Sequence, residues 1–173
     1  MLTLAQKTYV PDDAFEQALI NLGYDTVLDD SVMTANINTV TIFSLSGWPC
    51  ISDATGIEDF VSLINLEVFQ CCLIDLDLSQ NINLTEVYID SADALQSLNL
   101  KNGNNTNMTI NIFYNVVSLL QCINVDDVVW ANNNWASLIN ASPSPLTGSN
   151  SYFSEDCYNA LFNACMIEAN YFI

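Results

Sequence analysis

Carboxylates and cysteines are the side chains through which this sequence could do chemistry. Twenty Asp and Glu residues stand against two Lys, Lys7 and Lys101, and the net charge is −18 with no Arg and no His. Without His, the chain cannot build a Ser-His-Asp or Cys-His nucleophile system or a His-ligated zinc site. A pair of carboxylates could still act as acid and base, as in a glycosidase, but no motif points to one. We therefore expect no enzyme activity, no catalytic residue and no cofactor.

Six cysteines, at positions 50, 71, 72, 122, 157 and 165, could form disulfides or remain as buried thiols. Cys71 and Cys72 are adjacent and would point to opposite faces of a strand, so we do not expect them to bond to each other. No Cys-x-x-Cys pattern occurs, which leaves a zinc or thioredoxin-type site without support. The residues by themselves leave the pairing open.

Acidic residues cluster at two places where calcium could bind. Asp25, Asp29 and Asp30 lie close together in the sequence, and Asp126 is followed by Asp127. Calcium prefers oxygen ligands, but neither cluster has the spacing of an EF-hand or of a glycine-rich calcium repeat. We expect these carboxylates to cap turns and face solvent, and we predict no metal site.

The negative charge restricts the partners of the protein. Nothing in the sequence could neutralise phosphates, which argues against nucleic acid as a partner. The same charge argues against binding to an anionic membrane surface. The sequence has no run of 18 or more apolar residues, so we predict no membrane-spanning helix.

A repeated apolar pattern organises the middle of the chain. The unit Leu-x-x-Leu-x-Val at 63–68 aligns with Leu-x-x-Val-x-Ile at 84–89, at a spacing of 21 residues. The unit at 73–78 aligns with the unit at 95–100 at a spacing of 22. The pattern predicts a β-rich leucine-rich repeat solenoid with 21–22 residues per turn and two short strands in each turn. The apolar-x-apolar segments lie at 43–45, 66–68, 76–78, 87–89, 98–100, 110–112 and 123–125.

In such a solenoid the apolar positions are buried between two walls, and the residues between them face water. No single turn can bury its own apolar face, so stability comes from stacking of the turns. A β-sandwich is the competing fold, because its strands also return about every 8–12 residues. The fixed Leu-x-x-Leu-x-Leu phase favours the solenoid.

The segments outside the repeats predict a cap at each end. A helix is expected over 11–23, with Asp12 or Asp13 as its N-cap and Gly23 at its end. After Asp126 the repeat stops; 132–134 and 142–149 predict loops, and 154–171 predicts a short amphipathic helix. We divide the chain into 1–7 (signal-peptide remnant or disordered start), 8–36 (N-terminal helical cap), 37–126 (leucine-rich repeats) and 127–173 (irregular or helical C-terminal cap).

Several stretches of the chain resemble secreted leucine-rich repeat proteins of Flavobacteria and their relatives. The resemblance implies an exported leucine-rich solenoid that binds at the cell surface or outside the cell, and it indicates no ligand and no catalytic residue. Many relatives carry further repeats and a C-terminal sorting domain, so this chain is either a minimal member or a fragment. The matching stretches are TYVPDDAFEQALINLGYD at 8–25, ANINTVT at 35–41, ISDATGIEDF at 51–60, LDLSQN at 76–81, LNLKNGNNTN at 98–107, CINVDDV at 122–128 and FSEDC at 153–157.

The resemblance also implies one disulfide. The cysteines that recur near the end of these proteins correspond to Cys122 and Cys157. A bond between them would tie the C-terminal cap to the last turn and would contribute about 2–4 kcal/mol.

The outward residues of one wall are candidates for ligand binding. On the wall that contains Leu66, Val87 and Ile110, outward residues of successive turns would form ladders, with the register near Ile110 open by one residue. Exposed aromatic rings among carboxylates and amides could stack on sugar rings or anchor a protein, although a plain solvated face has the same composition. The candidate residues are Asn65, Glu67, Phe69, Glu86, Tyr88, Asp90, Asn111 and Phe113.

From these features we expect a secreted or cell-surface recognition or adhesion module that binds a protein or glycan through this wall. The alternative is a structural spacer, or a fragment of a larger surface protein, that has no ligand of its own.

Overall fold

A computed structural model describes residues 5–46, 50–113, 119–137 and 151–157. The body of the protein is a β-solenoid of about three turns with two parallel four-stranded sheets. The front sheet has the strand order β3-β4-β6-β8, and the back sheet has the order β10-β9-β7-β5. The front strands are β3 (Ile42–Ser46), β4 (Asn65–Phe69), β6 (Glu86–Asp90) and β8 (Thr109–Phe113); the back strands are β5 (Asp75–Asp77), β7 (Ser97–Asn99), β9 (Cys122–Asn124) and β10 (Tyr152–Ser154).

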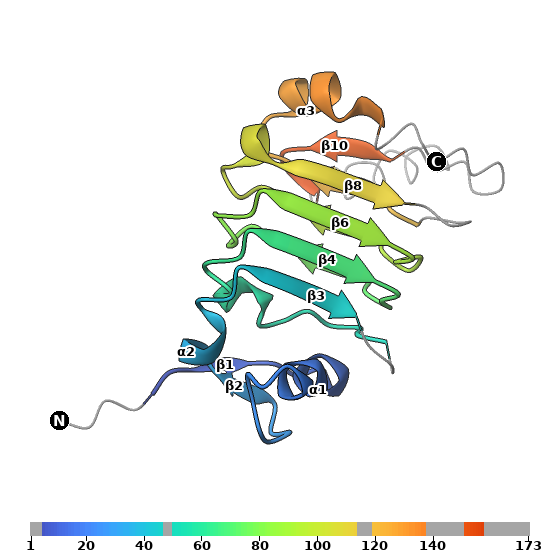
Figure 1. The fold of residues 1–173 in the computed structure, drawn as a ribbon. Coiled ribbons are helices and arrows are strands. Elements are labelled where there is room, and N and C mark those ends of the chain that lie inside the picture. Colours follow the sequence, from blue (N-terminus) through green and yellow to red (C-terminus); the bar gives the residue numbers. More distant parts are fainter. Residues whose placement is uncertain (1–4, 47–49, 114–118, 138–150, 158–173) are drawn as a thin grey trace, which may run out of the picture.

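The register of the strands follows the repeat in the sequence. Leu66 on β4 is the partner of Val87 on β6, at a separation of 21 residues. Leu76 on β5 is the partner of Leu98 on β7, at a separation of 22 residues. All front strands run in the same direction, and Figure 1 shows them stacked as successive rungs. The predicted alignment of alternate units is therefore the observed strand pairing, and a β-sandwich is excluded.

The core lies between the two sheets and is built from the apolar positions of the repeat. Leu66, Val87, Leu76 and Leu98 are each at most 1% exposed, so the two walls bury their inward residues equally well. Burial of one such side chain stabilises the fold by about 1.5–3 kcal/mol. Because each coil is only one layer thick, this burial is available only when the next coil is present.

Buried asparagines close the corner between a back strand and the following front strand. Asn81 is fully buried, and its Nδ2 donates to the backbone oxygens of Ile57 (2.8 Å) and Phe60 (3.3 Å) in the preceding coil. One coil later, Asn102 donates through Nδ2 to the backbone oxygen of Asn81 at 2.9 Å. These bonds satisfy carbonyl groups that the tight corner removes from water. These corners are therefore part of the packed interior.

Short elements cover the N-terminal end of the stack. They are β1 (Lys7–Tyr9), α1 (Asp13–Asn21), β2 (Ser31–Met33), α2 (Thr34–Ile37) and, between β3 and β4, the 3-10 turn η1 (Ile57–Asp59). β1 and β2 pair antiparallel, and α1 occupies most of the helix expected over 11–23. Phe15 of α1 is fully buried, with its ring centroid 5.8 Å from that of Phe43 and 6.4 Å from that of Phe60. This helix therefore shields the first coil from solvent.

Asp12 joins the helix α1 to the first coil. Its Oδ1 accepts a hydrogen bond from the Phe15 amide (2.9 Å), which caps the helix. Its Oδ2 accepts from the amide (2.9 Å) and hydroxyl (2.8 Å) of Ser52 and from the Asp53 amide (3.1 Å). Partial burial raises the pKa of Asp12, but these hydrogen bonds outweigh it and leave the pKa below its ordinary value.

Gly56 allows the N-terminal segment to lie directly on this coil. Its φ is +107°, in a region that side chains rarely adopt. A Cβ atom there would lie 2.9 Å from both the Tyr9 carbonyl oxygen and the Val10 Cγ2 atom. The position therefore requires glycine for its backbone angle and for its contact distance.

At the C-terminal end the structure corrects one expectation. Residues 132–134, predicted as a loop, belong to the helix α3 (Val128–Asn134). Asp127 caps this helix by accepting a hydrogen bond from the Trp130 amide at 2.9 Å. Ala131 of α3 is fully buried, and the Trp130 and Trp135 rings pack edge to face at 5.0 Å. Tertiary packing thus overrides the low helix propensity of the three asparagines.

Strand pairing also continues beyond Asp126, where the sequence repeat stops. β10 pairs in parallel with β9 and points the buried Phe153 inward. Ser154, expected to begin a helix, instead ends β10, which forms the edge of the back sheet beside β9. The remainder of the helix expected over 154–171 and most of the loop expected over 142–149 lie outside the described residues, as does Cys165. Within the described part of the chain, every helix is too short or too polar to cross a bilayer.

Candidate binding surface on the front sheet

The eight candidate residues all lie on front strands. β4 carries Asn65, Glu67 and Phe69, while β6 and β8 carry the other five. Strand pairing sets them in three rows across the sheet, and Asn111 aligns with Tyr88, which fixes the register left open near Ile110. The rows are Asn65–Glu86–Thr109, Glu67–Tyr88–Asn111 and Phe69–Asp90–Phe113. We call this outer face of β3, β4, β6 and β8 the front wall; for Phe113 only the backbone position is described.

The front wall also includes β3, whose outward residues were not among the candidates. Ile42, Ser44 and Ser46 extend the three rows by one strand, opposite Asn65, Glu67 and Phe69. The signal was present in the sequence, since the unit at 43–45 repeats the apolar-x-apolar pattern. Applying the same alternation there would have added these three positions.

Four residues in the middle of the front wall form a square of alternating chemistry. Phe69 and Tyr88 occupy one diagonal, and their rings lie nearly parallel, with centroids 6.4 Å apart and planes inclined by 5°. Glu67 and Asp90 occupy the other diagonal, because Glu67 is the strand partner of Tyr88 and Asp90 is the partner of Phe69. We call this set the aromatic–acidic square. It brings two aromatic rings and two carboxylates together on the outer face of the sheet, where Glu67 and Phe69 are exposed and Tyr88 and Asp90 are half-buried.

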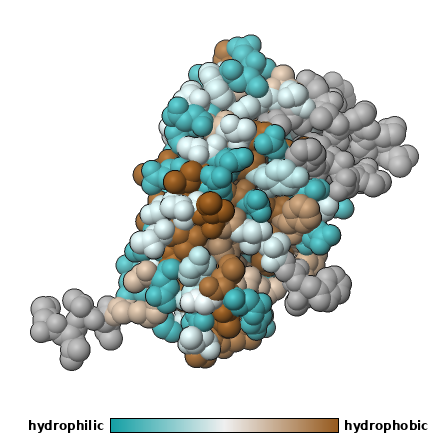
Figure 2. Space-filling model, viewed as in Figure 1, coloured by the Kyte–Doolittle hydropathy of each residue, from teal (hydrophilic) through white to brown (hydrophobic). Residues whose placement is uncertain are grey.

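Exposed apolar side chains line the corner where the front strands begin. Ile42 is 65% exposed and Ile82 is 62% exposed, while Val61 and Ile64 are 49% and 40% exposed. Asn83 links this corner across coils by donating through Nδ2 to the Val61 carbonyl oxygen at 2.8 Å. We call the four apolar residues the apolar ridge. Figure 2, drawn from this side, shows hydrophobic patches among hydrophilic ones over the front sheet.

A hollow of about 390 Å³ lies at the opposite corner, where the front strands end. The disulfide Cys50–Cys72 forms part of its lining, with the two Cα atoms 5.6 Å apart. Gln70 and Ser91, which directly follow β4 and β6, have φ angles of +51° and +56°. This left-handed geometry is uncommon outside glycine, and its repetition in successive coils gives the corner a fixed shape.

Four of the five described cysteines form disulfides, including a Cys50–Cys72 bond that the sequence left open. Cys72 pairs with Cys50, and Cys122 pairs with Cys157 (S–S 2.05 Å), which confirms the pairing that the family resemblance implied. Cys71 does not bond to its neighbour; its thiol is buried and donates to the Leu45 carbonyl oxygen at 2.9 Å. Burial raises the pKa of Cys71 to about 11, so the thiol stays protonated at neutral pH.

Carboxylates also gather beside the back sheet. A hollow of about 230 Å³ is lined by Asp53, Glu58, Asp75 and Asp77, all of which are exposed. Three of these side chains already accept hydrogen bonds from nearby amides, as Asp77 does from Ser79 at 2.8 Å. This arrangement is typical of carboxylates that cap turns.

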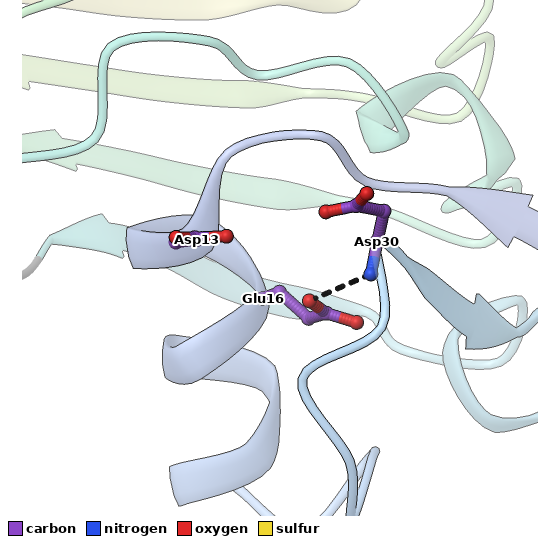
Figure 3. Close-up of side chains that lie close together, drawn as sticks. All are labelled: Asp13, Glu16 and Asp30. Atoms are coloured by element: carbon purple, nitrogen blue, oxygen red, sulfur yellow. Dashed lines mark hydrogen bonds between the residues drawn. The ribbon is translucent and has the colours of Figure 1, made fainter.

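The N-terminal acidic cluster is organised by a residue that the sequence did not single out. Glu16 is fully buried and accepts hydrogen bonds from the amides of Asp29, Asp30 and Ser31 at 2.9–3.0 Å. Carboxylate oxygens of Asp13, Glu16 and Asp30 lie within 4.8 Å of one another, as do those of Glu16, Asp25 and Asp29. Figure 3 shows Glu16 directed at the backbone of Asp30. Glu16 belongs to both sets of carboxylates, and its hydrogen bonds fix the loop that precedes β2.

The second acidic cluster also caps backbone groups. Asp126 accepts hydrogen bonds from the amides of Gly103 (2.9 Å) and Asn105 (3.1 Å), and Asp127 caps α3. The expected capping role is therefore confirmed for this pair. Neither lysine neutralises the front wall: Lys7 pairs with Asp29 at 3.1 Å, and Lys101 donates to the Glu155 carbonyl oxygen at 2.9 Å.

Comparison with known proteins gives a weak structural likeness. No protein-family model matches the chain, and no curated protein is significantly similar in sequence. Among solved structures, the functional domain of InlJ from Listeria monocytogenes, a leucine-rich repeat protein described as including a cysteine ladder, matches with a TM-score of 0.36 and 23% identity. The match covers 72% of this chain and 29% of that chain, so this chain spans less than a third of that structure.

Proposed function

We propose that the protein is an extracellular or cell-surface recognition module that binds a protein or glycan through the front wall and has no catalytic activity. The stacked Phe69–Tyr88 pair on the outer face of the sheet, with Phe69 exposed and Tyr88 half-buried, carries this proposal. Aromatic rings at the centre of a surface supply most of the binding energy in many interfaces. Exposed aromatic residues scattered singly are normal on a solvated face, whereas these two lie side by side.

The two disulfides support a location outside the cytosol. Such bonds form and persist in oxidising compartments and are rare where thioredoxin and glutathione keep thiols reduced. Cys50–Cys72 and Cys122–Cys157 both connect segments that belong to different coils or to a coil and its cover. The resemblance to secreted flavobacterial repeat proteins points to the same location.

The test is a screen of the folded chain against arrays of glycans and proteins. The double variant Phe69→Ala, Tyr88→Ala should weaken binding of any front-wall ligand at least about tenfold. Its melting temperature should fall by no more than about 6 °C, because a stacked pair contributes only about 0.5–1.5 kcal/mol. The matched control is Ser97→Ala, Asn99→Ala on the back sheet, which should leave binding unchanged.

Two results would contradict the proposal. A ligand that binds both double variants equally well would place recognition elsewhere on the molecule. A complete absence of ligands on both arrays would favour the alternative, a spacer without a ligand of its own.

A further inference from the structure

We infer that the front wall takes a basic polypeptide segment, and that the aromatic–acidic square is its arginine subsite. This inference rests on the proposed function and specifies the class of partner. The square combines two chemistries that a guanidinium group uses at once: flat rings on which it stacks and carboxylates with which it pairs.

The geometry of the square fits a planar cation. Neighbouring strands of a sheet lie about 4.8 Å apart, and residues two positions apart on one strand are separated by about 6.6 Å. A guanidinium that stacks on the face of either ring therefore lies between the strand positions of Glu67 and Asp90. Glu67 and Asp90 provide two carboxylates from different strands, so they can bind its two edges.

Charge complementarity selects the partner. The described residues of the front wall include Glu67, Glu86 and Asp90, and no lysine lies on these four strands. Because the whole chain carries a net charge of −18, the counter-charges must come from outside it. An anionic glycan would be repelled by these carboxylates, whereas a cationic side chain would be attracted to them.

The apolar ridge indicates a second feature of the segment. A five-residue strand spans about 13 Å, which separates the ridge at the start of the strands from the square near their ends. An extended peptide covers the same distance in about four residues. We therefore expect the segment to carry an aliphatic side chain about four residues away from its arginine, facing Ile42 and Ile64.

The test uses random peptides displayed on phage and selected against the immobilised full chain, followed by Kd measurements on synthetic copies. Selected peptides should be enriched in arginine. Exchange of that arginine for citrulline, its neutral isostere, should weaken binding about tenfold or more, and exchange for lysine should weaken it less. Binding should also weaken as the salt concentration rises from about 50 to about 300 mM.

Two charge variants of equal size separate the subsite from general attraction. Glu67→Gln, Asp90→Asn on the front wall should weaken the peptides about tenfold or more. Asp75→Asn, Asp77→Asn on the back sheet removes the same charge and should change Kd by less than about threefold. Equal losses in both variants, or selected peptides without arginine, would overturn the arginine subsite.

The outcomes also distinguish this inference from the proposed function. One outcome is a neutral glycan that loses affinity in Tyr88→Ala but not in Glu67→Gln, Asp90→Asn. It would support recognition by the front wall and would contradict the proposal of a basic partner. Arginine peptides that bind Phe69→Ala, Tyr88→Ala as well as the unaltered chain would overturn both.

Discussion

The front and back sheets have similar inward side chains and different outward side chains. Most inward positions of both sheets carry leucine, isoleucine or valine, with phenylalanine at Phe43 and Phe153, and residues such as Leu66 and Leu98 have almost no exposure. Outward positions differ in arrangement: the front strands place Phe69, Tyr88, Glu67 and Asp90 side by side, whereas the outward residues of the shorter back strands are Asp75, Asp77, Ser97, Asn99, Asn124, Tyr152 and Ser154. The front strands have five residues each and the back strands three.

This difference distinguishes the residues that stacking of the coils requires from those that it does not require. Stacking requires apolar inward residues on both walls, because each coil completes the core of its neighbour. Stacking places no demand on large aromatic residues facing water. Among the described back strands, the outward carboxylates of β5 and the outward Tyr152 of β10 lie at opposite edges of the sheet, so the aromatic–acidic square has no counterpart there and is the best guide to function.

The strongest test of the shared inward rule is a matched pair of core substitutions. Leu66→Ala on the front and Leu98→Ala on the back should each lower the free energy of unfolding by about 2–5 kcal/mol, because each leaves a cavity between the walls. Denaturant unfolding of the two variants measures this directly. A loss below about 1 kcal/mol at either position would show that the walls are not packed alike.

The two disulfides extend the comparison to the ends of the sheets. Cys50–Cys72 closes a separation of 22 residues beside the front strands, and Cys122–Cys157 closes one of 35 residues at the back sheet. Removing either bond by double Cys→Ser substitution should cost about 2–4 kcal/mol, with the longer loop costing slightly more. Thermal unfolding under non-reducing conditions is the measurement, and free thiols at Cys122 and Cys157 in the native protein would refute the second bond.

The corner between the sheets provides a smaller effect. Asn81→Ala should cost about 1–3 kcal/mol, since it removes the side-chain donor from the carbonyl groups of Ile57 and Phe60, each of which keeps one backbone donor. Asn83→Ala, two residues away on the exposed side, should cost less than about 1 kcal/mol. Equal losses, measured by urea unfolding, would mean that the buried asparagine has no special role in turning the chain from back to front.

The smallest effect concerns the joint between α1 and the first coil. Because the folded pKa of Asp12 is lowered, its contribution is complete well above the ordinary value of 3.8 and is lost as the pH falls toward the folded pKa. Asp12→Ala should cost about 0.5–2 kcal/mol at pH 7, and the difference from the unaltered chain should shrink below about pH 5. Unfolding curves at several pH values test this, and a difference that grows on acidification would contradict it.

The sequence predicted the coils well because their signal is local and repeated. The phase of the units at 63–68 and 84–89 gave the strand register between β4 and β6 without further information. It also placed the eight candidate residues on the front strands. The missed outward residues of β3 obey the same rule and were within reach of the pattern.

The ends of the stack were harder to predict. α3 contains three consecutive asparagines, and β10 lacks the Leu-x-x-Leu-x-Leu phase, so local sequence argued against both elements. Their formation depends on an apolar surface that the last coil exposes and that Ala131, Trp135 and Phe153 cover. The central role of Glu16 was equally hidden, because its hydrogen-bond donors are 13 to 15 residues away.

The sequence by itself determined the coil length, the inward face of each strand and the negative charge, because periodicity and composition fix them directly. Only the tertiary structure decided that Phe69 and Tyr88 stack with Glu67 and Asp90 on the crossing diagonal. The physical reason is that a diagonal neighbour depends on the register between two strands and on the side-chain torsions together. A pattern along one chain contains the first of these and not the second.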